Sequence, residues 1–267
     1  LQDVTGLGPV PVVAPGTHDT ASAVAAVPAA DGNWAYISSG TWSLMGIEAD
    51  KPNSTQKAYD YNFTNEGGVF GTIRFLKNIM GLWLVQRCRA AFDTEYDYDI
   101  LIRMAAEAPR FVSLIDPDRD EFLNPASMTD AIDEFCRQTN QPVPDSEGAY
   151  VRCCLESLAL QYRCVLEMLT DVYEKSFDTI HIVGGGTQNK LLNQFTADAT
   201  GTTVITGPVE ATIIGNLIMQ AIGMGHIKDL SEGRQIVRNS FELETFTPQQ
   251  TDQWDQSYER FMQLKGI

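Results

Sequence analysis

The sequence lacks any long uninterrupted hydrophobic run. Its most apolar stretch, residues 213–222, is interrupted by Gly, Asn and Gln and is shorter than the roughly 20 residues that a membrane-spanning helix needs. The opening LQDVTGLGPVPVV has neither the basic segment nor the apolar core of a secretory signal, and Leu1 stands where Met would start a complete protein. We therefore expect a cytoplasmic protein of which this chain is a truncated part.

Basic residues are scarce. Nineteen Lys and Arg against 35 Asp and Glu give a net charge of −16. A chain of this charge repels nucleic acid and anionic membranes, so neither is an expected partner. An anionic nucleotide would need a local site within this unfavourable overall field.

The five cysteines form no CxxC pair and no Cys/His cluster that could hold a tetrahedral metal. We interpret them as reduced structural thiols, although Cys136 and Cys153 could pair if the fold brings them together. The acidic segment FVSLIDPDRDEFLNP, residues 111–125, is predicted to be a solvated surface turn. Pro117 and the missing loop glycine and distal Glu exclude an EF-hand. No residue is therefore predicted to be a metal ligand.

The pattern of apolar residues predicts a mixed α/β domain that covers residues 1–267 without an internal repeat or linker. Strands and helices alternate, and the last third reads as a βαβα unit with a parallel sheet. The expected strands are residues 10–14, 34–38, 43–48, 179–183 and 203–206. The expected helices are residues 20–27, 75–92, 128–139, a long one from 150, and residues 189–200, 210–224 and 248–265.

The segment PGTHDTASAV places His18, Asp19 and Thr20 between a strand and a helix, where side chains are held rigidly beside a cleft. A carboxylate at such a place suits general-base chemistry. The residues alone favour capping, because the Asp19 side chain could accept a hydrogen bond from an otherwise unpaired N–H of the following helix. Both interpretations nevertheless stay open.

Two further turns could bind phosphate. The run SSGTWSLMG forms a turn of small residues between two strands, whose N–H and hydroxyl groups can face phosphate oxygens; a plain hairpin fits equally well. The run IHIVGGGTQN places three glycines between a strand and a helix, where the backbone can approach an anionic ligand. It is neither a Walker loop nor GxGxxG, and a tight structural turn is the alternative.

These motifs occur together in an order and spacing that resemble the C-terminal domain of the FGGY carbohydrate kinase family. The resemblance covers essentially the whole chain and rests on GTHDTASAV, SSGTWSLMG, TNEGG, LKNIMGLWLVQR, HIVGGGTQNKLLNQ and GPVEATIIGN. It implies a ribonuclease-H-like (actin-like ATPase) domain, in which helices flank a mixed sheet. It also implies a partner that this chain lacks, since members of the family close two such domains over a cleft.

The resemblance further implies roles for individual residues. Asp19 matches the catalytic base, and His18, Asp19, Thr20 and Asn78 match substrate contacts. Thr41, Gln86 and the loop of Gly184, Gly185 and Gly186 match nucleotide contacts. Ordinary alternatives exist for two of them: Asn78 could cap a helix that begins at Ile79, and Gln86 could be a solvated surface residue.

The implied reaction is transfer of a phosphoryl group from ATP, with Mg²⁺, to a sugar. The sequence HDT, in place of a GDQ-like sequence, indicates the branch that phosphorylates the C1 hydroxyl of L-rhamnulose. A kinase for another ketose, such as L-fuculose or D-xylulose, and a non-catalytic nucleotide-binding module are the alternatives. The isolated chain is expected to bind ATP without efficient turnover, because the N-terminal domain is absent.

Overall fold

The computed structural model describes residues 2–6, 8–30 and 32–266, and within them seven strands form one sheet of order β3-β4-β2-β1-β5-β6-β7. Strands β1, β5 and β6 run parallel to one another, whereas the pairs β1–β2, β2–β4, β3–β4 and β6–β7 are antiparallel. The strands are β1 (Trp34–Ser39), β2 (Trp42–Ala49), β3 (Thr64–Gly67), β4 (Ile73–Met80), β5 (Thr179–Val183), β6 (Thr203–Thr206) and β7 (Thr245–Phe246).

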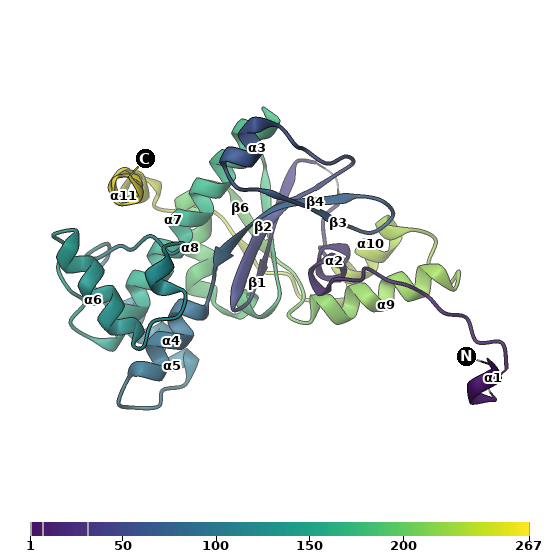
Figure 1. Cartoon of the computed structure of the whole chain (residues 1–267), viewed down its shortest axis with the longest axis horizontal. Coiled ribbons are helices and arrows are strands. Elements are labelled where there is room, and N and C mark those ends of the chain that lie inside the picture. Colours follow the sequence, from purple (N-terminus) through teal and green to yellow (C-terminus); the bar gives the residue numbers. More distant parts are fainter. Residues whose placement is uncertain (1, 7, 31, 267) are drawn as a thin grey trace.

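Helices cover both faces of this mixed sheet. Figure 1 shows α7 and α8 on one side of the central strands and α2, α9 and α10 on the other. The α-helices are α1 (Gln2–Thr5), α2 (Asp19–Ala25), α3 (Gln56–Asp60), α4 (Trp83–Ala91), α5 (Tyr98–Glu107), α6 (Met128–Gln138), α7 (Glu147–Tyr173), α8 (Lys190–Thr200), α9 (Ala211–Gly223), α10 (Leu230–Ser240) and α11 (Thr251–Lys265). Short 3₁₀ turns, η1 (Asp120–Phe122) and η2 (Gly185–Gln188), lie in two of the connections.

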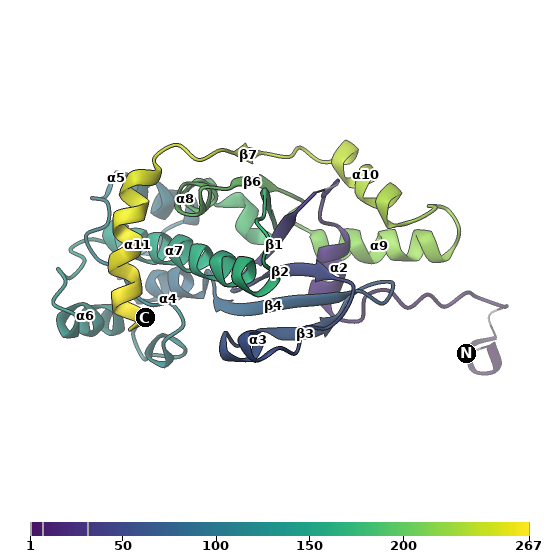
Figure 2. The ribbon, with the colours of Figure 1, turned by 90° about the horizontal axis from the view of Figure 1, so that it is seen from above.

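The two faces of the sheet belong to different hydrophobic clusters, because side chains alternate along a strand. Ile37 of β1 packs into the larger cluster around α7, whereas its neighbour Tyr36 packs into the smaller cluster beneath α2. Helix α7 is buried over most of its length, and its Arg152 and Glu156 form an ion pair with side chains 4% and 1% exposed. Figure 2 shows α11 lying across α7 at the outer side of that larger layer.

Several predicted elements agree with the structure. The strands expected at 179–183 and 203–206 are β5 and β6, and the helices expected at 189–200 and 210–224 are α8 and α9 within a residue or two. Asn189 caps α8 by accepting a hydrogen bond from the N–H of Leu192 at 3.0 Å, and Gly201 ends the helix with φ +63°. These local signals explain why the C-terminal unit was predictable.

Three expectations were wrong. Residues 10–14 form no strand, since they pair with no neighbour among the described residues. Residues 75–92 are not one helix but strand β4 followed by α4, because β4 is held between β2 and β3. The segment 111–125 is not simply a solvated turn, because Leu114 and Ile115 are fully buried. The N–H of Ile115 donates a hydrogen bond to the buried Oγ of Ser157 on α7 at 2.9 Å.

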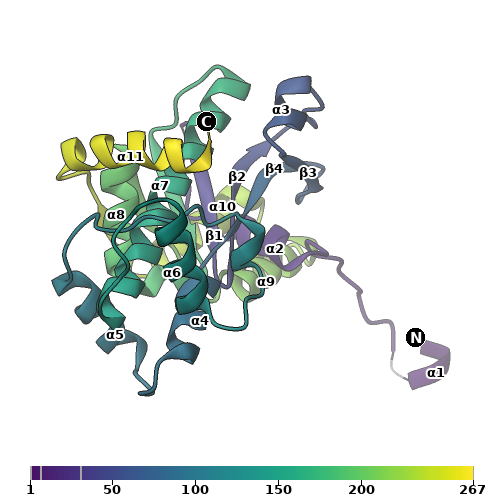
Figure 3. The same ribbon diagram turned by 60° about the vertical axis from the view of Figure 1, so that its left-hand side comes forward.

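All five cysteines are buried free thiols, so Cys136 and Cys153 are not paired. Burial raises the pKa of the Cys136 thiol to about 11, which keeps it protonated at neutral pH. Among the helices that the structure describes, none is long and apolar enough to cross a membrane. The N-terminal segment extends away from the body of the molecule, as Figure 3 shows.

Candidate active site

An open cleft of about 570 Å³ lies where α2 begins, beside the β1–β2 turn and the glycine run. Six predicted site residues line it: His18, Asp19, Thr20, Asn78, Gly184 and Gly185. Ser38, Ser39, Gly40, Trp42, Leu44, Val209 and Thr212 complete its wall. The structure therefore brings together residues that are up to 194 positions apart in the sequence (212 − 18). Thr41, Gln86 and Gly186 are adjacent to this wall but are not part of it.

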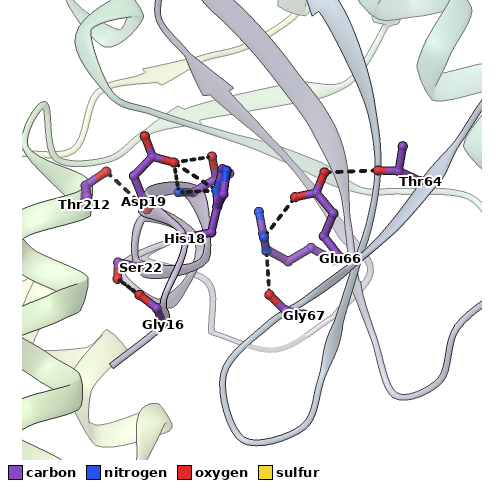
Figure 4. A network of polar contacts seen from close by, with 10 residues as sticks. Gly16, His18, Asp19, Ser22, Thr64, Glu66, Gly67 and Thr212 are labelled. Carbon is purple, nitrogen blue, oxygen red and sulfur yellow. Dashed lines mark hydrogen bonds and ion pairs between the residues drawn. The ribbon is translucent and has the colours of Figure 1, made fainter. Parts of the chain in front are cut away.

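The start of α2 holds Asp19 at the cleft. His18, not Asp19, is the N-cap, with extended backbone (φ −102°, ψ 141°) and Nδ1 accepting from the N–H of Thr20 at 3.3 Å. Asp19 is the first helical residue, and its Oδ1 accepts from the N–H and hydroxyl of Thr20 at 2.6 and 3.2 Å. Thr212 of α9 donates to the carbonyl oxygen of Asp19 at 3.3 Å (Figure 4). The local turn is thus fixed from both sides.

The Asp19 carboxylate remains accessible and has no cationic Lys or Arg partner among the described ion pairs. Its side chain is 74% exposed, and its close ionisable neighbour is His18, with Nδ1 at 2.9 Å from Oδ1. A protonated Nδ1 would donate to Asp19, whereas an unprotonated one accepts from Thr20. Either way the second carboxylate oxygen is free to accept a proton or a hydrogen bond from a ligand in the cleft.

Asn78 reaches the same cleft from strand β4. It lies directly opposite Leu44 of β2 in the antiparallel register, and both residues line the cleft. The hypothesis that Asn78 caps a helix is wrong, because the helix begins five residues later at Trp83. Its exposed amide therefore lies on the sheet face that α2 covers, in the part that α2 leaves open.

The β1–β2 turn is tied to the start of α4. The N–H of Leu82 donates to the carbonyl of Gly40 at 3.0 Å, and the N–H groups of Gly81 and Trp83 both donate to the carbonyl of Thr41, at 3.2 and 3.1 Å. The hydroxyl of Thr41 then donates to Oε1 of Gln86 on α4 at 3.4 Å. Thr41 and Gln86 therefore form one polar pair at the turn.

The glycine run packs against the end of β1. Gly184 has φ +90°, and a Cβ there would lie 2.8 Å from the carbonyl oxygen of Ser39. A Cβ on Gly186 would lie 2.0 Å from the Ser39 hydroxyl oxygen, so this glycine is required for packing beneath the cleft. Gly185 has no such neighbour and is exposed. The run is thus both a tight structural turn and, at Gly184 and Gly185, part of the wall.

Sequence reasoning did not identify Trp42, Val209 and Thr212 as part of the site. Trp42 and Val209 are apolar residues that are 46% and 40% exposed at the cleft. Val209 and Thr212 lie within the motif GPVEATIIGN, but the contact of Thr212 with Asp19 crosses 193 residues of sequence. Only the exposed tryptophan within SSGTWSLMG offered a signal, since a turn seldom needs a large apolar side chain in solvent.

The mixed seven-stranded sheet, its helices on both faces and the cleft beside β1 define a ribonuclease-H-like, actin-like domain. Solved sugar kinases have this fold: the TM-score is 0.71 to xylulose kinase from Rhodospirillum rubrum, at 18% identity over 99% of this chain and 53% of that one. It is 0.61 to Plasmodium falciparum glycerol kinase with ADP, at 15% identity over 93% and 49% of the two chains.

Residues 35–224 match the FGGY family of carbohydrate kinases, C-terminal domain, and the chain belongs to this family. It is 53% identical to a rhamnulokinase from Bacteroides thetaiotaomicron over 98% of its length, and 45% identical to a rhamnulokinase from Bacillus subtilis over 88%. These alignments cover 54% and 49% of the two relatives. The chain thus spans about half the length of the curated relatives it matches.

Proposed function

We propose that this chain is the C-terminal domain, over residues 1–267, of a cytoplasmic ATP-dependent kinase that converts L-rhamnulose to L-rhamnulose 1-phosphate. The observation that carries the reaction is the exposed Asp19 carboxylate in a cleft bounded by two candidate phosphate-binding turns. The substrate rests on similarity to rhamnulokinases along nearly the whole chain. A missing N-terminal domain supplies the opposite wall of the cleft.

In this proposal Asp19 is the general base. Its free carboxylate oxygen accepts the proton of the sugar C1 hydroxyl while the hydroxyl oxygen attacks the γ-phosphorus of ATP. The bond from the γ-phosphorus to the β,γ-bridging oxygen breaks at the same time and releases ADP. Such a base contributes roughly 10² to 10⁴-fold to the rate. His18, Thr20 and Asn78 position the sugar, since they line the same cleft as Asp19.

The nucleotide occupies the side of the cleft formed by the two turns. Thr41 and Gln86, joined by a hydrogen bond, and the Gly184–Gly186 turn contact ATP. Gly184 and Gly185 allow phosphate oxygens to approach the backbone, because no Cβ intervenes.

Mg²⁺ fits this site only as an ion carried with ATP. No group of three or more His, Cys, Asp or Glu residues that could cage a metal exists in the part of the chain that the structure describes. Mg²⁺ in such sites is commonly held largely by substrate phosphates and water, so the ion would enter with the nucleotide and leave the Asp19 carboxylate to act as the base. When bound, the ion neutralises charge on the phosphoryl oxygens.

The test is sugar-dependent ADP release by the two-domain protein with L-rhamnulose, L-fuculose, D-xylulose and glycerol. Asp19→Asn should lower kcat on L-rhamnulose by at least about 10²-fold with a smaller change in KM. The matched control is Asp99→Asn, an exposed aspartate in the first turn of α5, which should leave kcat unchanged. Preference for another sugar of the panel would reassign the substrate, and full activity of Asp19→Asn would remove the base from the mechanism.

The isolated chain provides a second test of the same site. It should be stabilised by ATP without releasing ADP, and a nucleotide at 100 times its Kd should add about 2.7 kcal/mol to the free energy of unfolding. If ATP stabilises the two-domain protein but the protein phosphorylates none of the sugars, the result would instead favour a non-catalytic nucleotide-binding module.

A further inference from the structure

Helix α9 has one buried face and one exposed apolar face. Ala211, Gly215 and Ile218 are buried, with Gly215 packed tightly against α2. On the other side Ile213 and Leu217 are 65% and 64% exposed and lie four residues apart, so they are neighbours on the helix surface. We call these two residues the α9 stripe.

The exposed face of α9 carries no charge. The helix sequence ATIIGNLIMQAIG contains no Asp, Glu, Lys or Arg, although 20% of the chain is charged. The polar side chains beside the stripe are the uncharged Thr212, Asn216 and Gln220. A solvated helix face normally carries charged residues, whereas depletion of charge around exposed large apolar side chains is typical of the centre of a protein–protein interface.

The stripe continues from the candidate active site. Val209, four residues before Ile213, is 40% exposed and lines the cleft together with Thr212. A body that covers the α9 stripe therefore also stands at the edge of the cleft that holds Asp19.

The N-terminal segment of the chain passes the same helix. A Cβ on Gly223, the last residue of α9, would lie 2.8 Å from Cγ1 of Val13, which shows that the segment packs against the helix end. Val10 and Val12 are then 61% and 77% exposed as the segment leaves the molecule on the α9 side (Figures 1 and 2). The segment therefore reaches the body of the molecule at the C-terminal end of α9, the helix that carries the stripe.

We infer that the α9 stripe is the docking surface for the N-terminal domain of the two-domain kinase. This inference rests on the proposed function for the existence of that domain, which the twofold length of the relatives supports. A second copy of this chain is a poorer occupant, because each copy carries a net charge of −16 and the two would repel. An anionic membrane is disfavoured for the same reason.

The experiment compares amide hydrogen exchange in α9 between the isolated chain and the two-domain protein, both without ATP or sugar. Docking should slow exchange at α9 amides by about tenfold or more, which corresponds to about 1.4 kcal/mol of docking free energy. The double variant Ile213→Glu, Leu217→Glu should abolish this difference and leave the melting temperature of the isolated chain nearly unchanged, since both side chains are exposed there.

The matched control is Ile236→Glu on α10, an isoleucine that is 42% exposed on a helix away from the cleft wall. It should change neither the exchange difference nor the melting temperature. Equal α9 exchange in the two forms of the wild-type protein would overturn the inference. So would α9 protection in the isolated chain that rises with its concentration, because a second copy would then occupy the stripe.

The readout separates this inference from the proposed function, since it requires no turnover. A two-domain protein that protects α9 but phosphorylates no sugar supports the docking surface and contradicts the kinase. A protein that phosphorylates L-rhamnulose with α9 unprotected supports the kinase and contradicts the docking surface.

Discussion

The contact between α2 and α9 yields a quantitative prediction for Gly215→Ala. A Cβ at Gly215 would lie 1.8 Å from the carbonyl oxygen of Ser22, and this oxygen already accepts the N–H of Ala26, the residue that caps the C-terminal end of α2. Neither backbone can yield alone, so the two helices must separate. Overpacking of this kind costs about 3 kcal/mol, and the better helix propensity of Ala offsets about 1 kcal/mol. We expect a net loss of about 2 kcal/mol.

That loss should lower the melting temperature of the chain by about 4–8 °C, followed by circular dichroism. Gly67→Ala is the matched control, because a Cβ there meets no atom within 4 Å, and its melting temperature should stay close to that of the wild type. A Gly215→Ala variant as stable as the wild type would refute the argument, since it would mean that α2 and α9 do not approach as closely as described. In the two-domain protein the same variant should lower kcat, because the hydrogen bond from Thr212 to the Asp19 carbonyl spans the same interface.

Two further predictions concern buried charge. Burial, with Arg234 and Arg238 nearby, lowers the pKa of His181 from 6.5 to about 4, so the unfolded chain binds a proton as pH falls below 6.5 while the folded chain does not. Stability should fall between pH 6.5 and 4 by up to about 3 kcal/mol in urea titrations, and His181→Asn should flatten this dependence. Arg152→Met should cost about 3–5 kcal/mol at pH 7 by leaving Glu156 buried without its partner. Burial already raises the pKa of Glu156; the loss should therefore shrink as pH falls toward the carboxyl range, and a cost that is independent of pH would contradict the assignment.

Prediction from the sequence succeeded where local chemistry decides the structure. Asn189 and Gly201 mark the two ends of α8, and the β-branched runs of β5 and β6 lie between such signals. It failed at residues 75–92, where Leu76, Ile79, Leu82 and Trp83 fit a helical spacing. Residues up to Met80 instead pair with β2 and β3, and no local pattern records that pairing. Distant strand partners overrode the local preference.

The candidate site divides in the same way. His18, Asp19 and Thr20 were predictable as a cluster because they are adjacent in the sequence, but which of them caps the helix depends on backbone angles at His18. The resemblance matched Thr41 and Gln86 separately to nucleotide contacts, and the hydrogen bond that joins them across 45 residues was not predicted. The contact from Thr212 to Asp19 was not predictable, because it follows from the packing of α9 on α2.

The same packing links the proposed base to the proposed docking surface. Asp19 begins α2, the α9 stripe lies on the far side of α9, and Gly215 holds the two helices at backbone contact between them. Because neither helix can shift without the other, a domain that docks on Ile213 and Leu217 is held at a fixed position relative to the Asp19 carboxylate. Phosphoryl transfer depends mainly on positioning, so a rigid connection between the docking face and the base is what a two-domain kinase requires.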